Sequence, residues 1–333
     1  MQFFERAKLK MNFTVFNKNG DVEGFCLIKE LEKRVTSKGK PYLDMVLADA
    51  TGEIPAKLWD YNEEAHSKYG AGQAIKVRGS INEYNGAEQL RVDMIRPLAA
   101  NDEVRMEDLV PSSEHSGDKM LEEIFKVVES FEDVELKNLV LAVLNEHKEK
   151  IVYWPAAFRL HHAMRGGLLY HTLSILRLAQ GVCKVYPFVN KDLLFAGVIL
   201  HDLAKTGEFD VTEAGIATGY TTDGTLVGHL VRGAMEIERI GKELGTPKET
   251  LMLVEHMIIS HHGEPEFGAV VRPMFLEAEL LSQLDMMDAR VYAISQAVDE
   301  VAPGEFTNRM WSLDNRKLYN HGRNKEEPKA NLI

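Results

Sequence analysis

Two different patterns of apolar and polar residues divide the chain near residue 98. Before that point, short segments rich in β-branched and aromatic residues alternate with turn signals, which predicts β-strands. After about residue 119, apolar residues recur at spacings of three and four, which predicts amphipathic helices. The polar stretch between the two contains Pro, Ser and Gly, as is typical of a linker. We therefore expect three parts: residues 1–97, a linker over 98–118, and residues 119–333.

The first part is predicted to be a small β-barrel. Strands are expected over residues 21–35, 41–49, 54–60, 73–84 and 88–98. The polar segment 61–70 fits a short helix between the third and fourth strands. Asn85-Gly86 is a strong signal for a tight hairpin between the last two strands. Five strands with a helix in that position is the order of an OB-fold barrel.

The last part is predicted to be all-α. Its helices are expected over residues 120–131, 136–150, 166–186, 190–205, 225–244, 249–262 and 275–301. The segment 208–224 interrupts them and is expected to form a short hairpin or a loop. The fold class is thus multi-domain, with an N-terminal all-β OB-fold barrel followed by an all-α domain.

Composition and charge exclude several classes of protein. The hydrophobic share of 45% and charged share of 27% are those of ordinary globular proteins. No window approaches the roughly 20 uninterrupted apolar residues that would span a membrane, and the amino terminus lacks the features of a secretory signal. Cys26 and Cys183 are too far apart to indicate a disulfide framework or a cysteine zinc site, so we expect a cytoplasmic protein.

The formal net charge of −12 argues against a protein that coats duplex DNA through bulk electrostatics. Nucleic acid is still allowed as a substrate. A local basic groove, or divalent metals in an acidic pocket, can hold phosphate while the remaining surface is acidic.

Histidines are concentrated in the helical part, where eight of the twelve fall between His161 and His262. Ionisable residues in or at the ends of predicted apolar helices form the candidate site: His171, His201, Asp202, His229, His261, His262 and Asp285. Burying such side chains unpaired costs several kcal/mol, and a bound divalent cation satisfies many of them at once. Imidazole nitrogen and carboxylate oxygen suit Mn, Fe, Co, Ni or Zn. One such histidine alone would more often be a packing residue, but the whole set, with Lys205 after Asp202, predicts a metal site.

The segment AGVILHDLAKTGEF resembles the HDxxK signature of the HD superfamily of metal-dependent phosphohydrolases. FRLHHAMRGGLLYHTLSI, GTLVGHLVRGA, IISHHGEPEFG and LLSQLDMMDAR are similar to the segments that supply the other metal ligands in that family. The resemblance implies a first metal held by His171, His201, Asp202 and Asp285. It implies a second metal bridged by Asp202 and held by His229, His261 and His262. His256 is an alternative ligand, because residues 256, 261 and 262 would project in different directions from a continuous helix.

Two divalent metals about 4 Å apart activate a water and clamp the phosphate oxygens, so no serine or cysteine nucleophile is needed. Asp202 and Lys205 are therefore the candidate catalytic residues, with Lys205 as a phosphate contact through its compact ammonium group. A surface role for Lys205 is the alternative. Weaker candidates for phosphate contact are Arg165, Arg232, His161 and His162.

An OB-fold barrel commonly binds single-stranded nucleic acid through aromatic and basic side chains on one face. The candidates here are Lys33, Arg34, Lys38, Lys40, Tyr42, Lys57, Trp59, Tyr84 and Arg91. For Trp59 and Tyr42 a place in the barrel core is an open alternative, because strand aromatics often fill the interior.

The order of the two domains, and the tail PGEFTNRMWSLDNRKLY, are similar to the YhaM-type 3′→5′ exoribonucleases over roughly residues 20–320. The first 15 or so residues depart from that family. The resemblance implies removal of nucleoside monophosphates from the 3′ end of single-stranded RNA, with single-stranded DNA as a further substrate. It implies two divalent ions per chain, Mn²⁺ first and Co²⁺, Fe²⁺, Ni²⁺ or Zn²⁺ as alternatives.

Two other functions compete with this one. The first is a nucleotide or cyclic-dinucleotide phosphohydrolase in which the barrel is regulatory. The second is an RNA-binding module whose helical domain is only structural. Apolar positions in the helices of residues 119–149 could pack internally or against another subunit, so a homo-oligomer is also open.

Overall fold

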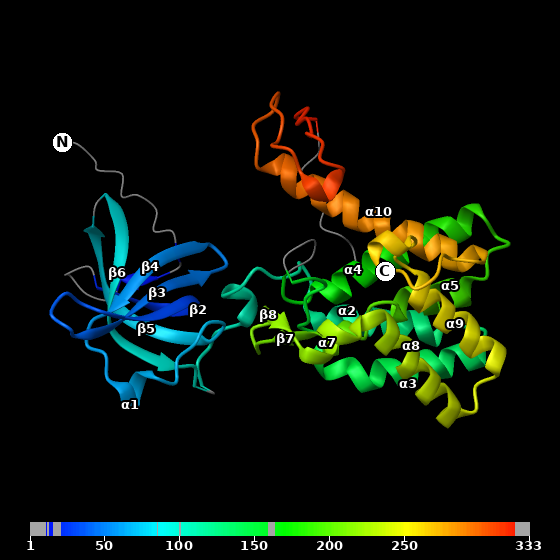
Figure 1. Ribbon diagram of the computed structural model, residues 1–333, viewed down its shortest axis with the longest axis horizontal. Helices are drawn as coiled ribbons and strands as arrows, with labels where there is room; N and C mark the ends of the chain where they lie inside the picture. Colours follow the sequence, from blue (N-terminus) through cyan, green and yellow to red (C-terminus); the bar gives the residue numbers. More distant parts are fainter. Residues whose placement is uncertain are drawn as a thin grey trace. The chain divides into compact units, whose positions relative to one another are not determined.

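The computed structural model describes residues 11, 13–15, 21–84, 86–99, 101–158 and 164–323. Contacts between residues divide the chain into two units (Figure 1). One comprises Met1–Ser112 with Thr212–Ile216, and the other comprises Ser113–Val211 with Ala217–Ile333. The linker limits of 98 and 118 stay a proposal. None of the described helices is long and apolar enough to cross a membrane.

The first unit contains a closed barrel of five strands. They are β2 (Asp21–Val35), β3 (Pro41–Asp49), β4 (Gly52–Leu58), β5 (Ala74–Tyr84) and β6 (Ala87–Pro97). The strand order is β2-β3-β4-β6-β5, and β5 pairs back with β2 to close the barrel. The β4–β6 pair is parallel, and α1 (Glu63–His66) lies between β4 and β5. This confirms the predicted OB-fold order.

Residues before the barrel belong to its core, which the sequence did not predict. β1 (Thr14–Val15) pairs with β2, and Met11 and Phe13 are buried among the barrel's core residues. Gly24 makes this possible, because a Cβ there would lie 2.4 Å from Cδ1 of Phe13. Part of the N-terminal extension is therefore a structural element of the barrel.

The segment after β6 also packs within the first unit. It contains the 3₁₀ turn η1 (Met106–Asp108), after which Leu109 and Val110 are buried in a small apolar cluster with Leu27 and Ala214. The polar composition of this stretch predicts a linker, and within it Leu109 and Val110 are buried while Val104 and Met106 are partly buried.

The second unit is helical, as predicted. Its longer helices are α2 (Gly117–Glu129), α3 (Val134–Ile151), α4 (Gly167–Val185), α5 (Lys191–Leu200), α8 (Gly228–Leu244), α9 (Lys248–Ser260) and α10 (Leu276–Asp299). Shorter ones are α6 (Lys205–Glu208), α7 (Thr222–Leu226), η2 (Pro265–Phe267) and η3 (Trp311–Leu313). The predicted hairpin is present between α6 and α7, formed by β7 (Phe209–Val211) and β8 (Ala217–Tyr220).

Helix α5 lies at the centre of this unit. Every residue from Asp192 to Leu200 is buried, and α5 packs against α3, α4, α9 and α10. A helix that is apolar all round is suited to such a position. The Asp192 carboxylate is satisfied by the backbone N–H groups of Glu132 and Asp133, at 2.7 and 2.8 Å. Because α5 is buried along its length, the residues that follow its C-terminal end, His201 and Asp202, also lie in the interior.

Candidate metal centre

His201 caps the C-terminal end of α5, and Asp202 follows it directly. Four other helices bring further polar side chains to this point. They contribute His171 from α4, His229 from the start of α8, His261 and His262 from the end of α9, and Asp285 from α10. His171, His201, Asp202 and His261 are at most 3% exposed. The structure thus brings together all seven residues that the sequence predicted as ligands.

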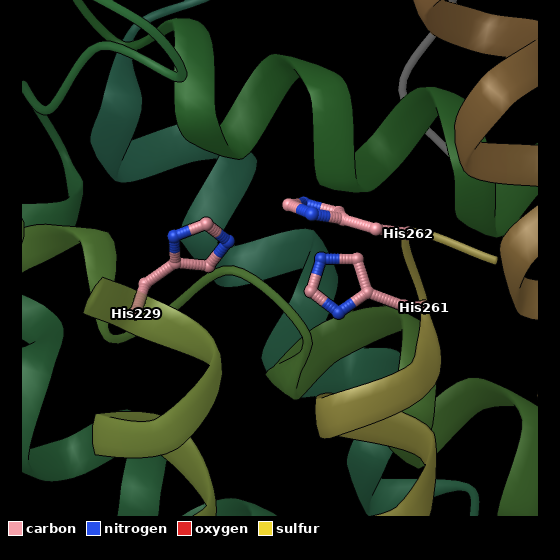
Figure 2. A group of neighbouring side chains, drawn as sticks. All are labelled: His229, His261 and His262. Atoms are coloured by element: carbon pink, nitrogen blue, oxygen red, sulfur yellow. The ribbon is translucent and has the colours of Figure 1, made fainter. Parts of the chain in front are cut away.

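The cluster consists of three groups of three residues, and within each group the ligand atoms all lie within 4.8 Å of one another. They are His171–His201–Asp202, His201–His261–Asp285 and His229–His261–His262. Figure 2 shows the third group, in which His229 faces the rings of His261 and His262 from the opposite side. Because His201 and His261 are each shared by two groups, the cluster is continuous.

Asp202 lies between the two halves of this cluster. Its Oδ1 is 3.3 Å from Nε2 of His229 and 3.6 Å from Nε2 of His261. Its Oδ2 is 3.3 Å from Nε2 of His201 and 3.8 Å from Nε2 of His171. The two carboxylate oxygens therefore face different pairs of histidines, as a bridging ligand would.

The end of α9 decides which histidines of its segment meet. On a continuous helix adjacent side chains diverge by about 100°. Because α9 ends at Ser260, the rings of His261 and His262 instead lie with centroids 4.4 Å apart. His256 is placed differently: its Nε2 accepts a hydrogen bond from the Met274 N–H at 3.0 Å. Within the described residues, His256 belongs to none of the three groups.

Each of the five histidines uses Nδ1 inside the protein, which leaves Nε2 for the cluster. Nδ1 donates to a backbone carbonyl in His201 (Val198, 2.8 Å), His261 (Ile258, 2.7 Å) and His262 (Phe267, 3.0 Å). A carboxylate takes that place for His171 (Asp288, 2.8 Å) and His229 (Glu208, 3.0 Å). Since a carbonyl can only accept, the lone pair of each of the first three rings lies on Nε2 when the ring is neutral. Such bonds orient metal-binding histidines in proteins.

Four buried polar atoms of the cluster have no hydrogen-bond partner among the described residues. They are Nε2 of His201, His229 and His261, and Oδ1 of Asp202. Each such atom costs about 1–3 kcal/mol when left unpaired. A divalent cation would satisfy all of them, and imidazole nitrogen with carboxylate oxygen suits Mn, Fe, Co, Ni or Zn. The residues present therefore fit a divalent metal centre.

The protonation states suit metal binding. Burial lowers the pKa of His229 and His261, and burial together with the neighbouring His261 lowers the pKa of His262 to about 4. Burial alone would raise the pKa of Asp202, but the Lys205 ammonium group holds it well below its usual range. These histidines are therefore neutral and the carboxyl is ionised, which are the forms that bind metals.

His171 differs from the other histidines. Burial lowers its pKa, but hydrogen bonds to Asp285 and Asp288 outweigh that effect and raise the pKa to about 10. The same contact holds the pKa of Asp285 below its usual range against the effect of burial. Binding of a metal at Nε2 of His171 must therefore release a proton.

The candidate phosphate contacts are placed unequally. Lys205 Nζ lies 2.7 Å from Oδ2 of Asp202, at the centre of the cluster. Arg232 is one turn after His229 on α8, where it is ion-paired with Asp223. Arg165 lies over the Tyr153 ring, 5.4 Å from its centroid. His161 and His162 lie outside the described residues.

The predicted nucleic-acid contacts of the barrel only partly share one face. Strand pairing places Arg34 opposite Tyr42, and Lys57 beside Arg91. Trp59 stacks on Tyr42 with ring centroids 4.6 Å apart, and Lys57 Nζ lies 5.4 Å from both centroids. Trp59 is 37% exposed, whereas Tyr42 is buried beneath it. This group, Arg34, Tyr42, Lys57, Trp59 and Arg91, is called the aromatic face below.

The other barrel candidates lie apart from this face or are neutralised. Lys33 pairs with Glu63 of α1, Lys40 pairs with Asp60, and Lys38 is in the exposed turn before β3. The side chain of Tyr84 lies outside the described residues. Within the aromatic face, acids also lie beside the cations: Asp44 is 3.0 Å from Arg34 and 3.9 Å from Lys57, and Asp93 is 3.6 Å from Arg91. Counting cations in the sequence overestimated the positive charge here.

Sequence reasoning missed the two carboxylates that hold ligand histidines, Glu208 and Asp288. Asp288 carried a usable signal, because it lies one helical turn after Asp285 and thus on the same face of α10. Glu208 carried none beyond its place three residues after Lys205.

Alanine substitutions at His261 and His256 should distinguish a metal ligand from a nearby histidine that binds no metal. We expect His261→Ala to lower the affinity for Mn²⁺ by at least about tenfold, since the loss of even an indirect contact costs 10–100-fold. His256→Ala should leave that affinity unchanged, because its Nε2 is bound to the Met274 amide. Isothermal titration with Mn²⁺ measures both. Equal losses in the two variants would contradict the assignment.

An OB-fold barrel followed by a helical unit with a buried histidine–aspartate cluster defines the class: a barrel-containing HD-domain protein. The HD domain family model matches residues 168–290. The chain is 38% identical to the protein named 3′-5′ exoribonuclease YhaM of Listeria innocua, over 90% of this chain and 95% of that protein. The proteins of the same name from Geobacillus sp. (strain WCH70) and Bacillus licheniformis are 38% and 36% identical, over 90% of this chain and 91% and 94% of theirs. The chain belongs to the YhaM family.

Proposed function

We propose that this protein is a metal-dependent 3′→5′ exoribonuclease that hydrolyses single-stranded RNA to nucleoside monophosphates. The observation that carries the proposal is the convergence of unpaired histidine nitrogens on the ionised Asp202. Its relatives, which bear the name 3′-5′ exoribonuclease, support the substrate and the direction of degradation. Single-stranded DNA as a further substrate, a cytoplasmic location and a homo-oligomeric state are finer parts of the same proposal.

Two divalent ions, Mn²⁺ in the first instance, would be held by the two halves of the cluster. The first half comprises His171, His201 and Asp285, the second His229, His261 and His262, and Asp202 belongs to both. Bound there, divalent metals would lower the pKa of a water and offset negative charge on the phosphate. Asp202 keeps its charge next to both halves, and Lys205 supplies a nearby cation whose pKa is raised by Asp202 against the effect of burial.

The direction of attack can be tested with a 5′-labelled single-stranded RNA in Mn²⁺. A free 3′ end should give a ladder of products shortened one nucleotide at a time, with release of nucleoside monophosphates. The same RNA with a blocked 3′ end should resist. Turnover of mononucleotides or cyclic dinucleotides beside an intact RNA would instead favour the small-molecule phosphohydrolase. Binding without any hydrolysis would favour the RNA-binding module.

The aromatic face is the proposed contact with the RNA chain. We expect Trp59→Ala to weaken RNA binding by about 5–150-fold, because stacking on an aromatic side chain contributes about 1–3 kcal/mol per base. Hydrolysis of a small phosphodiester such as bis(p-nitrophenyl) phosphate should be unaffected. Fluorescence anisotropy with labelled RNA measures the first effect. Phe188→Ala, which removes an exposed ring from the helical unit, is the control, and a similar loss in both variants would refute a specific role for Trp59.

A further inference from the structure

We propose that Glu208 is a positioning residue for the second metal, the one assigned to His229, His261 and His262. The inference rests on the two-metal centre of the proposed function, but it concerns metal binding and not RNA. Glu208 is the last residue of α6, three positions after Lys205.

Glu208 holds His229 at two points. Its Oε2 lies 3.0 Å from Nδ1 of the His229 ring, and its Oε1 accepts from the His229 backbone N–H at 3.4 Å. His229 is the second residue of α8, where backbone N–H groups lack partners within the helix. One carboxylate therefore fixes both the start of α8 and the rotation of the ring. That rotation points Nε2 at Oδ1 of Asp202, 3.3 Å away.

The backbone of Glu208 is itself fixed. Its carbonyl oxygen accepts from the Thr221 N–H at 3.0 Å and from the Thr221 hydroxyl at 3.3 Å, across the base of the β7–β8 hairpin. Helix α7 approaches so closely that a Cβ at Gly224 would lie 2.2 Å from that carbonyl oxygen. The side chain of Glu208 thus starts from a constrained position.

Of the three histidines assigned to the second metal, His229 differs in that its ring is oriented by a side chain. His261 and His262 are oriented by backbone carbonyls, which no substitution removes. In the other half of the cluster, Asp288 meets Nδ1 of the His171 ring as Glu208 meets Nδ1 of the His229 ring. Loss of Glu208 should therefore weaken the second metal site and spare the first.

Glu208 is also reachable from solvent. It lines a pocket of about 530 Å³ together with His147, Thr206 and Glu236. A small carboxylate in that pocket could occupy the space left by a shortened side chain. Rescue of this kind tests the hydrogen bond to His229 directly, because a general structural defect would not respond to it.

The test uses Glu208→Ala and Glu208→Gln in the full chain, titrated with Mn²⁺ alone by calorimetry. Glu208→Ala should lower the affinity of one site by about 10–100-fold and leave the other unchanged. Glu208→Gln, which keeps an acceptor but not the charge, should lose less. Formate should restore the affinity in the alanine variant, whereas chloride at equal ionic strength should not. The matched control is Glu236→Ala, which lines the same pocket and meets Nε2 of His147 at 3.0 Å.

Each outcome supports or overturns the positioning role of Glu208 independently of RNA hydrolysis. Selective loss at one site with rescue by formate supports the role of Glu208 even if the protein degrades no RNA. Unchanged Mn²⁺ affinity in both Glu208 variants overturns it, whatever number of ions the wild type binds. Equal loss at all sites, or an equal loss in Glu236→Ala, also overturns it. Should the alanine variant fail to fold by circular dichroism, the glutamine variant decides.

Discussion

Asp202→Asn is expected to lower the rate of phosphodiester hydrolysis by at least about 10³-fold. The two oxygens of Asp202 face histidines of both halves of the cluster, so one neutralised carboxylate weakens both metal sites. Metal ions stabilise the transition state of phosphoryl transfer by several kcal/mol, and each 1.36 kcal/mol is a factor of ten in rate. Single-turnover RNA digestion in Mn²⁺ measures the loss.

A matched control separates this effect from a loss of folding. Asp192 is also a buried aspartate on the α5 segment, but its carboxylate binds backbone N–H groups at the opposite end of the helix. Asp192→Asn should lower stability while the Mn²⁺ content of the folded fraction stays at the wild-type level. Hydrolysis that survives in Asp202→Asn would show that the cluster is not the catalytic centre.

The neighbouring Lys205 affects the stability of the Asp202→Asn variant, and a second substitution at Lys205 separates that effect from the loss of activity. Its ammonium group is 2.7 Å from Oδ2 of Asp202 and is largely buried, so neutralising Asp202 leaves a buried cation without its main partner. Such an unpaired charge costs stability on its own account. The double variant Asp202→Asn/Lys205→Met removes both charges. It should regain stability without regaining activity, which would show that the lost activity is not a consequence of lost stability.

The strands of the barrel could be predicted because apolar alternation and turn signals agree locally. The Asn85-Gly86 signal falls between the last residue of β5 and the first of β6, with Asn85 itself outside the described residues, and the buried residues of β3 and β4 alternate with more exposed ones. The burial of Met11 and Phe13 was not predicted, because two apolar residues in a charged segment show neither the strand nor the helix periodicity. Their burial depends on the space beside Gly24, which is a property of the folded barrel and not of the local sequence.

The ligand cluster was predictable because metal ligands are restricted to a few residue types, and these recur at the ends of apolar helices. The choice between His256 and the pair His261 and His262 was not predictable. It depends on α9 ending at Ser260, a boundary that the apolar pattern does not mark. Glu208 and Asp288 were missed for another reason: their contacts with ligand histidines join residues 21 and 117 positions apart, although the place of Asp288 one turn after Asp285 was a usable signal. Carboxylates are common along helices, so Glu208 is singled out only by its contact with His229 in the folded chain.

Removal of the metals should destabilise the helical unit more than any single exposed substitution. At free metal of about 1,000 times Kd, one bound ion stabilises the folded state by about 4 kcal/mol. For a unit of this size, each kcal/mol shifts Tm by about 2–4 °C, so chelation should lower its Tm by about 8–16 °C. Calorimetric scans with Mn²⁺ and with excess EDTA measure the difference.

The same scans contain an internal control, because the barrel holds none of the proposed ligands. The unfolding transition of the barrel can be followed by fluorescence in the wild type and in Asp202→Asn. In each protein its Tm should be the same with Mn²⁺ and with EDTA. The helical transition of Asp202→Asn should already lie at or below the chelated wild-type value, because Lys205 has lost its partner, and it should respond little to EDTA, because the carboxylate shared by both metal sites is neutral. If EDTA lowered the helical Tm equally in both proteins, the stabilising ions would have to bind away from Asp202. The unpaired nitrogens of His201, His229 and His261 would then need another partner.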